Sequence, residues 1–126
     1  MTLKQYKDDF KASFNWNEAI SIGKIDNNKE KAICFYNSKR GISPIKAIDE
    51  STYKFKPITI LLRYTKNQDN AEQMANAIYK FYDDRTFNIE TKRIYAQHIY
   101  SNPIDLGSDD NGVYEYSIEI NMLEER

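Results

Sequence analysis

The chain has 126 residues, a size typical of one domain with its own core, and we expect residues 1–126 to form a single domain. Its 18 basic and 19 acidic residues nearly cancel, which argues against general binding to nucleic acid or to a membrane surface. A single cysteine excludes an internal disulfide, and without a signal peptide or a long apolar run we expect a protein made and kept in the cytoplasm.

The first predicted element is a short amphipathic helix. Thr2 can cap its start, and the helix is expected to end at Asn15. Its apolar residues recur every three to four positions, with charged residues between them. They are Leu3, Tyr6, Phe10 and Phe14.

Two alternating segments then predict a β-hairpin. Ala19–Ile25 and Lys31–Asn37 are separated by turn-forming residues at Asp26–Lys29. Residues 38–44 have the composition of a loop, and residues 45–53 are compatible with a short edge strand or a turn of helix.

The most distinct element is a helix predicted over Asp69–Asp84. Asp69 and Glu72 have the spacing of a capping box, which would place the helix start at Asp69. One face is apolar and predicts burial against a sheet. Its residues are Ala71, Met74, Ala75, Ile78, Phe81 and Tyr82.

Strands of that sheet are predicted on both sides of this helix. Ile58–Tyr64 follows Pro57, which would interrupt a central ladder but can open a strand or lie at its edge. Ile94–Tyr100 follows the helix, and Val113–Leu123 is the last strand, after a twelve-residue loop at Ser101–Gly112.

The resulting order α-β-β-β-α-β-β indicates an α+β fold. We expect a mostly antiparallel (mixed) β-sheet with α-helices packed on one face. The step from the third strand through the second helix would be a right-handed crossover if the strands that it joins are parallel.

No residue pattern predicts catalysis, a cofactor or a metal site. His98 lies in mid-strand, where a half-buried, hydrogen-bonded imidazole is the ordinary arrangement, and Cys34 alternates like a small core residue. The acidic cluster before Gly112 lacks the spacing of a calcium loop. Lys39–Gly41 could hold a phosphate, but a solvated turn is the simpler interpretation.

The run SNPIDLGSDDNGVYEYSIEI, residues 101–120, resembles the carboxy-terminal end of the minor capsid, or tail-completion, proteins of phages and prophages of Gram-positive bacteria. In these a loop Pro-x-x-Leu-Gly-x-Asp-x-x-Gly leads into a final aromatic-rich strand. The preceding order of ITILLRY and DNAEQMANAIY is also similar, so the resemblance spans most of residues 55–123. The amino-terminal helix is shorter here than in that class, which leaves open a truncated amino terminus or a variant from a headless tail-like particle.

This resemblance implies a tail terminator, a structural protein that forms a hexameric ring, caps the tail tube and joins it to the head or neck. The implied partners are other copies of the chain, the tail tube protein and a neck or head-completion protein, with no membrane and no sequence-specific nucleic acid. The implied location is the virion, or a tail-like particle, after assembly in the host cytoplasm.

A long loop in a compact domain is usually functional, so Ser101–Gly112 is expected at a subunit or tube contact. Its candidate residues are Asn102, Pro103, Asp105, Gly107 and Asp109. The alternative is a small ferredoxin-like binding or regulatory domain without enzymatic activity.

Overall fold

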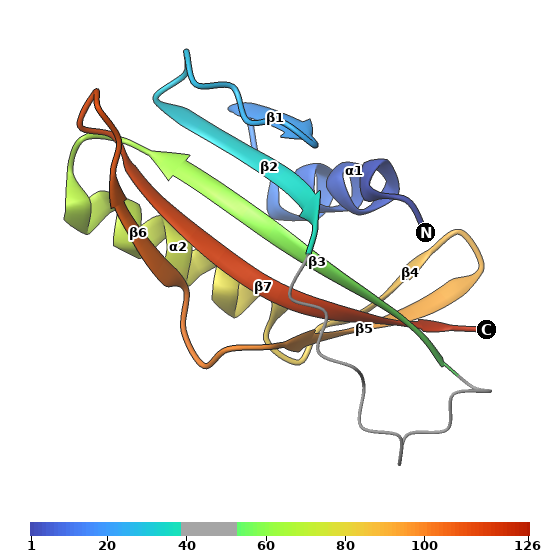
Figure 1. Ribbon diagram of the computed structural model, residues 1–126. Helices are drawn as coiled ribbons and strands as arrows, with labels where there is room; N and C mark the ends of the chain where they lie inside the picture. Colours follow the sequence, from blue (N-terminus) through green and yellow to red (C-terminus); the bar gives the residue numbers. More distant parts are fainter. Residues whose placement is uncertain (39–52) are drawn as a thin grey trace.

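The computed structural model describes residues 1–38 and 53–126 and contains two helices and seven strands (Figure 1). The predicted loop at 38–44 and the unassigned segment at 45–53 lie outside the described residues, except for Ser38 and Tyr53. The elements are α1 (Leu3–Phe14), β1 (Ala19–Ile22), β2 (Lys31–Asn37), β3 (Tyr53–Tyr64), α2 (Gln68–Tyr82), β4 (Thr86–Ile89), β5 (Lys92–His98), β6 (Ile104–Ser108) and β7 (Tyr114–Glu125).

The strands form one mixed sheet in the order β1-β2-β3-β7-β5-β4, and β6 also pairs with β7. This confirms the α+β prediction and its order of elements, to which the structure adds β4 and β6. The long strand β7 lies between β3 and β5 and is antiparallel to both. Strands β3 and β5, between which the chain passes through α2 and β4, therefore run in the same direction.

Helix α1 forms as the sequence predicts. The Thr2 side chain accepts a hydrogen bond from the Gln5 N–H at 3.2 Å, and the Gln5 side chain accepts one from the Thr2 N–H at 2.8 Å. These two bonds complete a capping box. Asn15 ends the helix in the left-handed conformation, which asparagine adopts more readily than most residues.

Helix α2 begins earlier than the predicted capping box would place it. Asn67 is the N-cap, and its side chain accepts a hydrogen bond from the Asn70 N–H at 3.2 Å. Asp69 lies in the first turn instead, where a carboxylate interacts favourably with the helix dipole, and it binds Gln73.

The predicted hairpin between the first two strands is wrong, because β1 and β2 are parallel. The connection from Gly23 to Glu30 returns along the sheet before β2 starts. Gly23 has φ +76°, a conformation that costs glycine little, and its N–H donates to Phe35 O at 3.0 Å. Residues 26–29 do form a turn, but the turn bends this return segment and does not join adjacent antiparallel strands.

Pro57 lies within β3, but its missing N–H removes no hydrogen bond to the central strand β7. Pro57 O accepts a hydrogen bond from Ser38 N at 3.1 Å, so Pro57 N faces the β2 side as well. On that side the register with β2 ends at Ile58, opposite Asn37. The missing N–H therefore falls just beyond the paired length of β2, while β3 continues to pair with β7 through Pro57 and Asn121.

Both helices cover the same face of the sheet, which we call the helical face. Alternate residues of β3 and β7 point into this core, and from α2 the residues Ala71, Ala75, Ile78 and Tyr82 are buried there, whereas Met74 and Phe81 are half-buried. The strand residues of the core include Ile58, Ile60, Leu62, Ile118, Ile120 and Met122, each at most 1% exposed. Neither helix is long and apolar enough to cross a membrane, as judged over the described residues.

Strand β7 is buried on its other face too, which the alternating sequence does not predict. Ser117, Glu119 and Asn121 point away from the helices yet are only 7–8% exposed. Near its end, Glu124 is buried on the helical face, where it binds the Met1 ammonium group at 3.2 Å and accepts a hydrogen bond from the Tyr6 hydroxyl. The strand is therefore held by polar contacts as well as by apolar packing.

Candidate functional site

The predicted loop Ser101–Gly112 is only partly a loop, because Ile104–Ser108 forms β6 and pairs with the first half of β7. The prediction missed this strand because Pro103, Gly107 and five acidic or amide residues dominate the segment Ser101–Gly112. β6 also contains a register shift between Asp105 and Gly107, where Leu106 is the extra residue. Such a bulge breaks the strict alternation by which a strand is recognised in a sequence.

The structure distributes the five candidate contact residues along this segment. Asn102 and Asp105 are exposed, and Pro103 and Gly107 are half-exposed. Gly107 has φ +81°, which the bulge requires and which glycine adopts at low cost. Asp105 accepts a hydrogen bond from Gly107 N at 2.8 Å and a longer one from the Gln68 side chain at 3.4 Å. Asp105 therefore supports the bulge and connects β6 to the start of α2.

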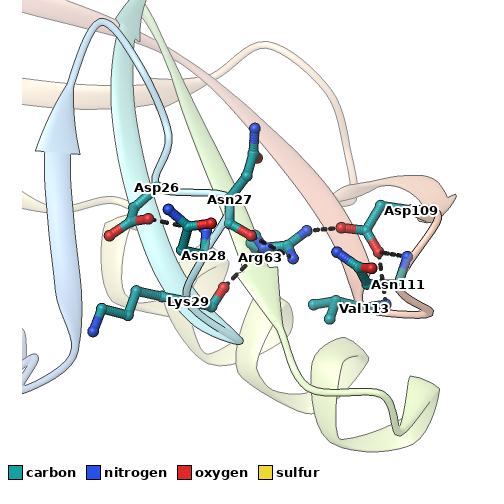
Figure 2. A network of polar contacts seen from close by, with 8 residues as sticks. All are labelled: Asp26, Asn27, Asn28, Lys29, Arg63, Asp109, Asn111 and Val113. Carbon is teal, nitrogen blue, oxygen red and sulfur yellow. Dashed lines mark hydrogen bonds and ion pairs between the residues drawn. The ribbon is translucent and has the colours of Figure 1, made fainter.

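Asp109 has a structural role within the chain, in addition to its place in the predicted contact segment. One carboxylate oxygen accepts hydrogen bonds from Asn111 N at 2.9 Å and Val113 N at 3.0 Å, and the other forms an ion pair with Arg63 (Figure 2). The hydrogen bond from Arg63 is the main reason that the pKa of Asp109 lies below its ordinary value, and the Val113 and Asn111 amides lower it further. These bonds commit the Asp109 side chain to the chain's own β6–β7 turn.

Arg63 is the centre of this network. Its side chain is 3% exposed and lies on the face of β3 opposite the helices. Besides Asp109, it donates to Lys29 O at 2.8 Å and to Asn27 O at 3.1 Å (Figure 2). Asp26 accepts a hydrogen bond from Asn28 N and so shapes the same turn. Arg63 therefore holds together the β1–β2 connection and the β6–β7 turn, which are far apart in the sequence. We call these contacts the Arg63 network.

Arg63 could not be identified from the sequence, because a single arginine in a predicted strand has no distinguishing signal. Its partners are a carboxylate 46 residues away and two backbone carbonyls. Glu115 pairs with Arg63 across the β3–β7 ladder. Burial raises the pKa of Glu115, and the Arg63 charge opposes that rise only in part. The turn-forming residues at 26–29 and 109–112, which the network joins, are a weak indication in the sequence of where it lies.

His98 and Cys34 lie away from this network. His98 is half-buried on the helical face: its ring stacks on Tyr79 with centroids 3.6 Å apart, and Nε2 lies 2.9 Å from Tyr79 O. Cys34 is fully buried in β2. Among the described residues no group of three or more histidine, cysteine or acidic side chains is placed to hold a metal ion, and Lys39–Gly41, considered for a phosphate, is outside those residues.

The comparisons with known proteins identify one family. A family model described as bacteriophage tail terminator protein matches residues 11–125, from the last turn of α1 through all seven strands. No curated protein and no solved structure matches the sequence. Members of the matched family are structural proteins of the phage tail. The chain therefore belongs to the bacteriophage tail terminator family and is a structural component of the virion tail.

Proposed function

We propose that copies of this chain form a closed ring that caps the tail tube and joins it to the head or neck. The observation that carries the proposal is the family match over residues 11–125, together with the resemblance of residues 101–120 to proteins of this class. A hexamer is expected from that resemblance. The ring's partners are the tail tube protein on one side and a neck or head-completion protein on the other.

The Arg63 network supports a contact role for the segment Ser101–Gly112. A surface that meets a partner loses less conformational entropy on binding when it is already ordered. Here Asp109 holds the β6–β7 turn onto β3, and Asp105 holds β6 onto α2. Among the side chains not used for these internal bonds, Leu106 and Asp110 are exposed.

Deletion of the gene tests the function. Tails made without the protein should be abnormal in length and should fail to join heads, and the wild-type gene supplied in trans should restore both properties. Electron microscopy of negatively stained tails provides the measurement. Normal tails that join heads in the absence of the protein would exclude the proposed function.

A double variant tests the contact segment without disturbing the Arg63 network. Asn102→Ala with Leu106→Ala changes two exposed side chains, so folding stability should change by no more than about 0.5 kcal/mol per site. Complementation should nevertheless fail. Asn76→Ala, an exposed position on α2, is the matched control and should complement fully. A folded double variant that complements like the control would remove this segment from the contact.

A further inference from the structure

Within residues 1–38 and 53–126 the sheet has two unpaired edges at the same level, β1 on one side and β6 on the other. In the described part of the chain β1 pairs only with β2, and β6 pairs only with β7. The registers connect them in one row, from Ser21 through Cys34, Leu61 and Ser117 to Ile104. Both edges therefore lie at the same height along the strands, whereas β4 pairs with β5 beside the other end of β7.

The directions of these two edge strands also suit pairing between copies. β1 is parallel to β2, and each of the following steps, β2 to β3, β3 to β7 and β7 to β6, is antiparallel. β1 and β6 of one copy therefore run in opposite directions. If copies are related by rotation about an axis along the strands, β1 of one copy meets β6 of the next as an antiparallel pair, the pairing more stable per residue.

The side chains at these two edges favour pairing with another strand over exposure to solvent. Soluble proteins usually protect open edges with charged residues or proline. β1, with the sequence AISI, has neither, and Ile22 is 43% exposed. β6 has one charged residue, and Leu106 is 52% exposed. Among the described residues only three large apolar side chains are exposed, and two of them lie on these two edges.

We propose that β1 of one copy pairs antiparallel with β6 of the next copy, so that the sheet continues from subunit to subunit around the ring. This inference rests on the proposed ring function and names its subunit contact. Because the contact uses two different edges, it is head-to-tail, the type of contact that generates rings when the rotation closes. Edges at the same height need no shift along the strands from copy to copy. The glycine bulge in β6 increases local twist and bending, which closing a sheet requires.

A cysteine pair tests this contact. In Ser21→Cys with Ile104→Cys the two positions share one row and one face, and within a copy they are four strand spacings apart, about 19 Å. That separation is far beyond disulfide range, so no bond can form within one copy. Between neighbouring copies the two cysteines would be directly opposite each other. Oxidation of the variant protein on tails should therefore give a ladder of disulfide-linked oligomers in non-reducing gels.

The matched control pairs Ser21→Cys with Asn88→Cys, an exposed position on β4. It should give no ladder, and each single variant should give dimers at most. A ladder from the control and none from the test pair would overturn the proposal. A ring on the tail end, seen by microscopy, without a ladder from the test pair would overturn the strand pairing but leave the ring function intact. Absence of any ring from wild-type tails would overturn both.

Hydrogen exchange of the unsubstituted protein provides a second measurement if the cysteine variant does not fold. Gly23 N–H points toward β2, where it binds Phe35 O, so the preceding Ile22 N–H points outward. Exchange of the Ile22 amide should be slower in the ring than in the free chain. Equal exchange in the two states would contradict the pairing.

Discussion

The two faces of the sheet are buried by different chemistry. On the helical face, alternate residues of β3 and β7 are aliphatic and pack against α1 and α2. On the opposite face the buried residues include Arg63, Ser117, Glu119 and Asn121. Thr59 donates a hydrogen bond to Glu119 there, and Arg63 binds the loops at one end. The helical face depends on filled volume, and the opposite face on the polar contacts of Arg63 and Glu119.

Removing volume from the helical face should have the largest effect. Ile78 is fully buried, so Ile78→Ala should lower the free energy of unfolding by about 2 to 5 kcal/mol through lost burial and the cavity left behind. Denaturant unfolding measures the change. Asn76→Ala, on the exposed side of the same helix, should change it by no more than about 0.5 kcal/mol. Equal values for the two variants would mean that α2 does not bury this face.

Removing a polar partner from the opposite face should cost nearly as much. Arg63→Met keeps most of the side-chain length but leaves Asp109 and two backbone carbonyls without their donor. We expect a loss of about 3 kcal/mol, at the low end of the range for a broken buried ion pair because Asp109 is partly exposed. The exposed Arg93→Met is the control. An unchanged unfolding midpoint for Arg63→Met would show that the network does not contribute to stability.

Acid should weaken the same network. The pKa of folded Asp109 is lowered from 3.8, so its stabilising contribution is present above that value and is lost as the pH falls through the lower folded pKa. Asp109→Asn lacks this contribution at every pH. The difference in thermal midpoint between wild type and variant should therefore be largest near neutral pH and should shrink below about pH 4. A difference that stays constant down to pH 2 would contradict the ion pair.

The smallest effect is expected at His98, on the rim of the helical face. Burial lowers the pKa of this imidazole below 6.5, and the hydrogen bond to Tyr79 O opposes the shift only in part. Because the folded state disfavours the charged ring, His98 should make the protein slightly less stable as the pH falls below 6.5. An NMR titration gives the pKa directly. A value above 6.5 would place the ring in a more solvated or more acidic setting than the structure describes.

The sequence by itself determined the elements whose signals are local. The amphipathic spacing in Leu3–Phe14 and around Ile78, and the alternation in β3 and β7, predicted both helices, the long strands and the helical face, because each pattern depends on residues a few positions apart. The family resemblance also rested on such patterns, and the match over residues 11–125 agrees with it.

Only the tertiary structure decided which strands pair and which polar residues are buried. The parallel pairing of β1 with β2 and the partners of Arg63 depend on segments that the fold brings together, and β6 was hidden by its bulge and its turn-forming residues. Turn-forming residues at 26–29 are compatible with a hairpin or with a return segment, and only the rest of the sheet selects between them. A buried charge likewise has no local signature, because its stability depends on partners that folding brings to it.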